Sequence, residues 1–142
     1  MEVFFRTHSY MVEHTNTNLR RSLMDEIDWT DRLIGIKGTR GVGKTTFLLQ
    51  YAKENYGPYD RRCLYINMNN FYFQGRGIAD FAGDFYRRGG RVLLIDQVYK
   101  QSDWSTELRR CYAYLRLLIF LPAILIPACA SSSPAFLMMY SA

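Results

Sequence analysis

Short apolar runs alternate with segments of helical periodicity along most of the chain. Each of the first three runs ends at or beside a polar, glycine or acidic position, as a strand buried in a parallel sheet does. In the intervening segments apolar side chains recur at helical spacing, and Gly-Pro or Gly-Gly pairs end two of them. This pattern predicts strands over residues 33–38, 63–68, 92–96 and 117–121 and helices over residues 22–27, 43–55, 78–88 and 105–114. Because alternating strands and helices build a parallel sheet covered on both faces, we expect an α/β fold with three layers.

The two ends of the chain differ from this middle part. Residues 1–22 are polar and aromatic without firm periodicity, and we interpret them as a helix or arm that leads into the core. After Arg116 the chain has no charged residue, and residues 117–130 are apolar throughout. That run of about 14 residues is shorter than the roughly 20 that a membrane-spanning helix needs, and Pro122 and Pro127 interrupt it. The sequence therefore does not favour binding to a membrane. It predicts three parts: an arm (1–22), a core (23–121) and an apolar tail (122–142).

Composition narrows the class of protein only slightly. Hydrophobic residues make up 49% and charged residues 22% of the 142 residues, which is typical of a globular domain. The net charge of +5 suits a polyanionic partner, which ATP and nucleic acid both are. Three cysteines lie far apart without a C-x-x-C pair, which predicts reduced thiols and a cytoplasmic location. His8 and His14 lack further metal-ligating partners in the sequence.

A phosphate-binding motif follows the first predicted strand. The segment that begins at Gly38 matches G-x-x-x-x-G-K-[ST] at every fixed position and leads into a predicted helix. Glycines let the backbone N–H groups turn toward a phosphate, and the positive end of the helix faces the same anion. Lys44 would then reach the β- and γ-phosphates, and the Thr45 hydroxyl would bind Mg²⁺. The candidate nucleotide-binding residues are Gly38, Thr39, Arg40, Gly41, Val42, Gly43, Lys44, Thr45 and Thr46.

A second acidic group is expected to complete such a site. Asp96 ends the apolar run 92–96, which is the usual place for an aspartate that holds Mg²⁺ beside a phosphate loop. The next residue is Gln97, where proteins that hydrolyse ATP usually carry glutamate. An amide cannot take up a proton at neutral pH, although it can orient a water molecule. Lys44 and Gln97 are thus the candidate catalytic residues, Thr45 and Asp96 the candidate metal ligands, and hydrolysis is expected to be weak.

An aromatic segment offers an alternative partner. Residues 71–73 are Phe-Tyr-Phe and are followed by Arg76, and such side chains can stack on the bases of a single strand. Aromatic side chains more often cover sheet edges or fill cores, and residues 87–91 and 109–110 are basic clusters of the kind that usually face solvent. Nucleic acid therefore stays an open but unsupported partner.

With these residues placed, the chain resembles the bacterial AAA-type P-loop ATPases that carry a DUF4143-like C-terminal region. The resemblance extends from about residue 25 to residue 114. Its pieces are Asp28-Trp29, residues 32–46, residues 64–67, residues 85–90, and Asp96 followed by Trp104-Ser105 and Glu107-Leu108. The resemblance implies an AAA-like P-loop fold, ATP and Mg²⁺ as cofactors, and possible self-association through an arginine offered to a neighbouring subunit.

Two departures from that family affect the expected function. The usual acidic pair is Asp96-Gln97 here, and a histidine common two residues after the glutamate is replaced by Tyr99. The family also continues into a polar strand end that senses the γ-phosphate, a helical lid and a C-terminal domain, whereas residues from 117 onward do not match this pattern. We interpret the core as incomplete at its C-terminus, with an out-of-frame tail or a truncated gene product as the hypothesis.

The sequence thus predicts an ATP-binding AAA-type protein, with weak Mg²⁺-dependent ATPase activity as one outcome. A non-hydrolysing nucleotide-dependent interaction module, or an inactive truncated remnant, is the alternative. A small-molecule kinase is less favoured because no acceptor-binding signature is present. A GTPase is less favoured because no [NT]-K-x-D segment is present.

Overall fold

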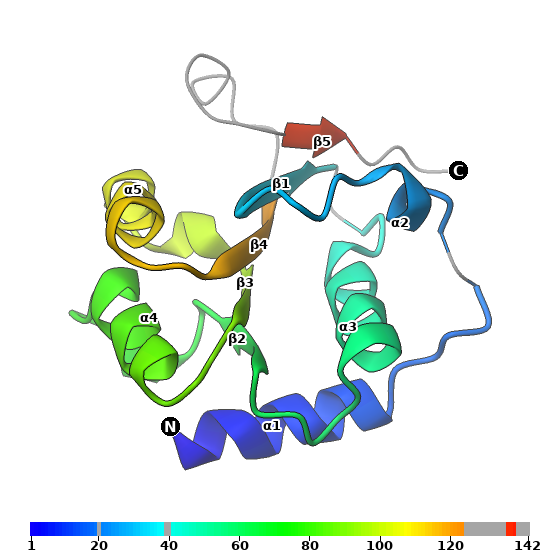
Figure 1. The fold of residues 1–142 in the computed structure, drawn as a ribbon, viewed down its shortest axis with the longest axis horizontal. Helices are drawn as coiled ribbons and strands as arrows, with labels where there is room; N and C mark the ends of the chain where they lie inside the picture. The colour runs from blue at the N-terminus through cyan, green and yellow to red at the C-terminus, as the bar shows by residue number, and fades with distance from the viewer. Residues whose placement is uncertain (20, 39–40, 124–135, 139–142) are drawn as a thin grey trace.

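The fold was analysed in a computed structural model, which describes residues 1–19, 21–38, 41–123 and 136–138. Helices and strands alternate through this part of the chain (Figure 1). The helices are α1 (Glu2–Glu13), α2 (Leu23–Glu26), α3 (Lys44–Asn55), α4 (Ile78–Arg87) and α5 (Trp104–Tyr114), with short 3₁₀ turns η1 (Phe71–Phe73) and η2 (Val98–Lys100). The strands are β1 (Leu33–Lys37), β2 (Cys63–Asn67), β3 (Val92–Asp96), β4 (Leu118–Ala123) and β5 (Phe136–Met138).

The strands form one sheet in which every described pairing is parallel. Their order is β2-β3-β4-β1-β5, so β1 lies between β4 and β5 and β2 is at an edge. The register pairs Asn67 with Asp96, and Ile34 with Phe120. All strands therefore end at the same edge of the sheet, where loops from several of them meet.

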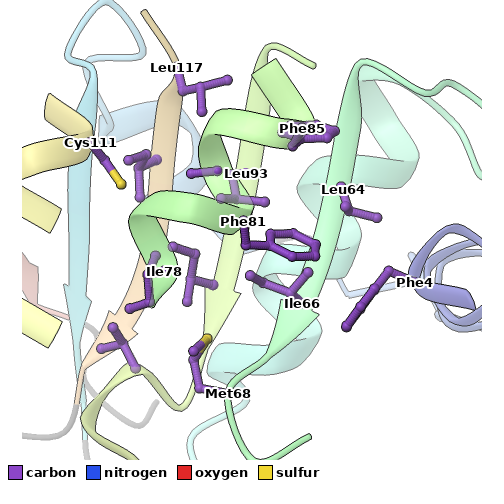
Figure 2. Packing of buried hydrophobic residues seen from close by; sticks show 14 of the residues in the cluster. Phe4, Leu64, Ile66, Met68, Ile78, Phe81, Phe85, Leu93, Cys111 and Leu117 are labelled. Carbon is purple, nitrogen blue, oxygen red and sulfur yellow. The ribbon is translucent and has the colours of Figure 1, made fainter. Parts of the chain in front are cut away.

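Helices cover both faces of the sheet, as the alternating pattern predicts (Figure 1). The α3 face is filled by Phe47, Leu48 and side chains of β1, β2 and β3 that point toward them. On the other face Phe81 and Phe85 of α4 pack on Leu64, Ile66 and neighbouring strand residues, as Figure 2 shows. The expected three-layer α/β architecture is confirmed, and the strands at 63–67 and 92–96 are buried along almost their whole length, as their apolar runs predict.

The N-terminal segment contains a helix that the sequence pattern left open. Helix α1 lies along the edge strand β2 and contributes to both faces, because Phe4 and Phe5 join the α4 side while Val12 joins the α3 side. His8 lies between them and is 1% exposed. Its Nδ1 accepts a hydrogen bond of 3.0 Å from the backbone N–H of Tyr65, which as an edge-strand donor has no neighbouring strand on that side. Helix α1 thereby covers the edge strand and satisfies one of its outward-facing N–H groups.

Glycines end helix α4 in the way expected from Gly89-Gly90. The N–H of Gly89 donates to Tyr86 O at 3.0 Å and that of Gly90 to Phe85 O at 2.9 Å. Gly89 has φ +93°, which a side chain rarely permits. These paired bonds satisfy carbonyl groups at the end of the helix and turn the chain directly into β3.

The C-terminal part of the described chain adds two strands to β1. Strand β4 covers residues 118–123, slightly beyond the predicted 117–121, and strand β5 pairs with β1 from Gly35 to Lys37. The division of the chain at residue 122 stays a prediction. Within the described residues no helix is long and apolar enough to cross a membrane.

Candidate nucleotide site

The candidate site lies at the edge where the parallel strands end. Strand β1 leads into the loop at Gly38, and β3 ends at Asp96. Helix α3 begins at Lys44, so its first turn faces the same region as Asp96. In open parallel sheets ligands bind outside the carboxyl ends of the strands, and this edge is therefore the expected position for one.

The described part of the loop has the backbone shape that its glycines permit. Gly41 and Gly43 have φ values of +84° and +86°. Gly43 then accepts the first bond of α3, from the N–H of Phe47 at 2.9 Å. Gly38 and Val42 are buried, and Thr46 is exposed. Thr39 and Arg40 lie outside the described residues, so their predicted contacts stay predictions.

Lys44 is folded back over the loop. Its Nζ donates a hydrogen bond of 2.8 Å to the carbonyl of Gly38, six residues earlier. Partial burial lowers the pKa of Lys44, and the nearby negative charge of Asp96 opposes that shift. The amine is therefore held at the loop, within the same electrostatic environment as the acid.

Thr45 and Asp96 are in direct contact. The Thr45 hydroxyl donates a hydrogen bond of 2.6 Å to Asp96 Oδ2, across 51 residues of sequence. The other carboxylate oxygen, Oδ1, accepts the backbone N–H of Gln97 at 2.9 Å. Asp96 is only 5% exposed, and a carboxylate that is so deeply buried needs these donors. The structure thus brings together the two residues that the sequence suggests as metal ligands.

Gln97 follows in an unusual backbone conformation. Its φ of 53° and ψ of 39° are left-handed, and among the described residues it is the one non-glycine residue with positive φ. Such a conformation costs about 1 kcal/mol or more for a residue with a side chain. It turns the chain sharply after β3, which leaves the Gln97 side chain half-buried beside the site.

Two residues near the site were missed by sequence reasoning. The Tyr65 hydroxyl donates a hydrogen bond of 2.8 Å to Asp96 Oδ2. The guanidinium of Arg21 lies against the loop, because a Cβ built on Gly43 would be 2.8 Å from Arg21 Nη2. The alternation of side chains along β2 and β3 could have indicated Tyr65, because Tyr65 and Asp96 both point to the face of the sheet that α3 covers. Arg21 carried no such signal, because its approach depends on how the chain between α1 and α2 folds back.

The aromatic segment after β2 is mostly occupied by packing. Phe73 is 2% exposed, and the Tyr72 ring contacts Phe4 and Phe81 at centroid distances of 5.1 and 5.9 Å. The Arg76 guanidinium lies 4.3 Å from the centre of the Tyr72 ring. Phe71 is 80% exposed and Tyr72 is 37% exposed, so Phe71 is the most accessible ring of this segment. Base stacking would have to rely mainly on Phe71, and a nucleic-acid partner stays unsupported.

The thiols and histidines that the structure describes are not gathered into a metal-binding cluster. Cys63 and Cys111 are buried and not bonded to each other, and burial raises the pKa of both thiols. Among the residues that the structure describes, no group of three or more potential ligands could hold a metal ion in the manner of a His-Cys-acid cluster. Cys129 lies outside the described residues.

Comparison with known proteins defines the class to which this fold and site belong. The family model described as an AAA domain matches residues 30–122, which is more than half of the chain and includes the loop, Tyr65 and Asp96. The chain belongs to this AAA-domain family, and the suspected resemblance to AAA-type P-loop proteins is confirmed.

Among solved structures, the chain is similar to one titled "Structure of C. elegans PCH-2", with a TM-score of 0.49 and 14% sequence identity over 98% of this chain. The chain spans 41% of the length of that protein. The search of curated proteins found no match.

Proposed function

We propose that this AAA-type chain binds ATP together with Mg²⁺ at the loop that precedes α3. The observation that carries the proposal is the hydrogen bond of 2.6 Å between the hydroxyl of Thr45 and Oδ2 of Asp96. It joins the end of the phosphate-loop motif to the acid that ends β3, although 51 residues separate them. A structural role alone would not require a glycine-rich loop, a lysine and a buried acid at one sheet edge.

The residues present fit a magnesium ion. A hydroxyl and a carboxylate are oxygen donors, and Mg²⁺ prefers such donors and usually binds few protein groups together with phosphate oxygens. Thr45 and Asp96 would hold the ion, which would neutralise charge on the phosphates when bound. The loop supplies backbone N–H groups to the phosphates, and Lys44 would exchange its bond to the Gly38 carbonyl for the β- and γ-phosphates.

ATP is favoured over GTP on the basis of the sequence. No segment of the form [NT]-K-x-D is present, and this segment reads guanine in many GTP-binding proteins of the P-loop class. Self-association is proposed only as a consequence of membership in the AAA family, and comparing the sedimentation of the chain with and without ATP would test it.

A non-hydrolysing, nucleotide-dependent interaction module is the second candidate. Gln97 favours it, because the position after the acid carries an amide and therefore no general base. Under this proposal bound ATP organises the sheet edge for a partner, and turnover is slow or absent. A weak ATPase differs from it only in that Gln97 orients a water molecule for attack on the γ-phosphate.

A fluorescence titration with a labelled ATP analogue, with and without Mg²⁺, tests the proposed binding. We expect saturable binding that Mg²⁺ strengthens in the natural chain. Replacing Lys44 with alanine removes a charged hydrogen-bond donor, so Lys44→Ala should weaken binding about 10- to 100-fold. Absence of binding by a folded sample would refute the proposal.

Lys53→Ala is the matched control for that titration. Lys53 lies on the same helix, near its end, and its Nζ donates to the carbonyls of Glu13 and Thr15 at 3.1 and 2.8 Å. About 13 Å of helix separates it from Lys44, so its loss should leave nucleotide affinity unchanged. Equal loss of binding in both variants would point to damage of the fold instead of the site.

A further inference from the structure

The side chain of Tyr65, on β2, contacts Asp96. Among the described residues of β2, it is the one whose side chain makes a hydrogen bond to this acid. It is 3% exposed, and its ring packs in the α3-side cluster while its hydroxyl lies 2.8 Å from Asp96 Oδ2. Because an ionised carboxylate accepts hydrogen bonds and cannot donate them, the Tyr65 hydroxyl is the donor.

Asp96 Oδ2 therefore receives two hydroxyl donors at once. Thr45 donates to it at 2.6 Å and Tyr65 at 2.8 Å, while Gln97 donates to Oδ1 at 2.9 Å. Three donors from three segments define the plane of the carboxylate. Of the two hydroxyls, that of Thr45 belongs to the phosphate-loop motif, whereas that of Tyr65 comes from a strand that carries no part of the motif.

The backbone of Tyr65 is held on both sides. On one side the β2–β3 register pairs Tyr65 with Leu94, and on the other His8 Nδ1 accepts the Tyr65 N–H at 3.0 Å. The ring cannot slide along the strand without breaking one of these interactions. Helix α1 is thereby connected to Asp96 through a single residue, from His8 to the Tyr65 backbone and from the Tyr65 hydroxyl to the carboxylate.

We propose that Tyr65 is a positioning residue of the nucleotide site, which orients Asp96 and so sets the Mg²⁺ concentration that nucleotide binding requires. This inference rests on the proposed function. When the Thr45 oxygen binds the ion, Tyr65 remains as the second donor that keeps Oδ2 in place. Tyr65 acts through Asp96 and itself contacts neither the ion nor the phosphates.

Replacing Tyr65 with phenylalanine isolates this role, because the ring and its packing are kept and only the hydroxyl is removed. Hydrogen bonds to charged groups contribute enough that losing one should raise the Mg²⁺ midpoint for binding of the labelled ATP analogue about tenfold. Affinity for the analogue without Mg²⁺ should stay unchanged, since the loop and Lys44 are intact. A merely structural role of Tyr65 would lower both affinities together.

Tyr51→Phe is the control variant. Tyr51 is 6% exposed, belongs to the same buried cluster and stacks on Trp29 with ring centres 4.3 Å apart. Its hydroxyl environment includes Tyr56 and Cys63, at the end of β2 away from Asp96. Tyr51→Phe should therefore leave the Mg²⁺ midpoint unchanged, and the thermal unfolding midpoint of each variant reports separately on packing.

The outcomes separate this inference from the proposed function. If the natural chain binds the analogue without any response to Mg²⁺, or does not bind it, the proposed function fails and the role of Tyr65 falls with it. If the natural chain responds to Mg²⁺ and Tyr65→Phe has the same midpoint, only the positioning role is overturned. Equal weakening with and without Mg²⁺ would overturn it as well.

Discussion

At the scale of single residues, the site depends on contacts between side chains that are distant in sequence. Asp96 accepts from Thr45 of α3 and Tyr65 of β2, and Tyr65 in turn is held by His8 of α1. Each of these groups is buried or partly buried, so its hydrogen bonds are shielded from water and their loss is costly. Substitutions here should change binding or pH dependence before they change the fold.

Gln97→Glu tests whether the amide limits turnover. The glutamate would supply a general base beside the proposed γ-phosphate position, and such bases contribute about 10²–10⁴ in rate. If ATP and Mg²⁺ bind as proposed, phosphate release per chain should rise by at least about tenfold in Gln97→Glu. Gln101→Glu is a control, because Gln101 Nε2 donates to the carbonyls of Phe73 and Arg76 and not to Asp96. Unchanged turnover in Gln97→Glu, with nucleotide binding intact, would favour the interaction module.

His8 should make the stability of the chain depend on pH. Burial lowers the pKa of His8 from its ordinary 6.5 to about 4. Above pH 6.5 the ring is neutral in both the folded and unfolded chain, and it contributes no pH dependence. As pH falls from 6.5 to 4 the unfolded chain takes up a proton that the folded chain does not, so the free energy of unfolding decreases by about 3 kcal/mol in total.

Urea unfolding between pH 7 and pH 4 measures this decrease. His8→Gln removes the titrating ring and should flatten the curve by about that amount, while His14→Gln, at an exposed position, should leave the curve as in the natural chain. If the free energy of unfolding falls equally with pH in the natural chain and in His8→Gln, the prediction is contradicted. The folded chain would then take up a proton at His8 as easily as the unfolded chain does.

At the scale of secondary-structure elements, ends and turns are determined by a few close contacts. Helix α4 begins where the N–H of Ala79 donates to Glu107 Oε2 at 2.9 Å and ends with the paired bonds of Gly89 and Gly90. Glu107 thereby links the start of α4 to α5, which packs beside it. The same apolar face of α4 carries Phe81 and Phe85 into the core (Figure 2).

Two glycine substitutions in and after α4 should have opposite effects. A Cβ added at Gly90 would lie 2.4 Å from Phe85 Cε1, and the Phe85 ring is fully buried and has little room to move. Gly90→Ala should therefore lower the free energy of unfolding by about 1–3 kcal/mol. A Cβ at Gly83 meets Arg87 Nη1 at an ordinary 3.5 Å, so Gly83→Ala should stabilise the helix by up to about 1 kcal/mol. Urea unfolding of both variants measures the two changes in the free energy of unfolding. Changes of the same sign would contradict the packing argument.

At the scale of the whole molecule, α1 joins the two faces of the sheet. It covers the β2 edge, contributes Phe4 and Phe5 to one core cluster and Val12 to the other, and leaves Val3 in solvent. An uncovered edge strand is a template for pairing with other chains, so this helix also protects the sheet against association. At the other edge of the sheet, the outermost strand is β5.

Removing the main contact of α1 should destabilise the chain as a whole. Phe4 is 7% exposed, and its ring lies 4.9 Å from Phe81 and 5.6 Å from Phe73, centre to centre. Phe4→Ala should lower the free energy of unfolding by about 3 kcal/mol, as other large-to-small core substitutions do. Val3→Ala on the same helix, at a position that is 67% exposed, should change it by less than about 0.5 kcal/mol. Equal values for the two would mean that α1 is not bound to the sheet in solution.

The sequence by itself determined the local elements and the identity of the loop. Apolar runs such as residues 92–96 and helical periodicity such as that of residues 78–88 depend on near neighbours, and the structure confirms both. The motif from Gly38 to Thr45, followed by Asp96 at a strand end, was equally readable, because its spacing reflects the geometry of one loop and two strand ends. These predictions needed no knowledge of which strand lies beside which.

Only the tertiary structure decided what depends on distant partners. The strand order, the pairing of β5 with β1, the position of α1 at the edge and the approach of Arg21 to Gly43 all join segments far apart in sequence. The periodicity of residues 1–22 was weak because the buried stripe of α1 includes the polar residue His8, while apolar Val3 and aromatic Tyr10 are exposed. Tyr65 looked like an ordinary strand residue until the register of β2 and β3 brought its hydroxyl to Asp96. Local sequence preferences specify which elements form, whereas the packing of those elements specifies which side chains meet.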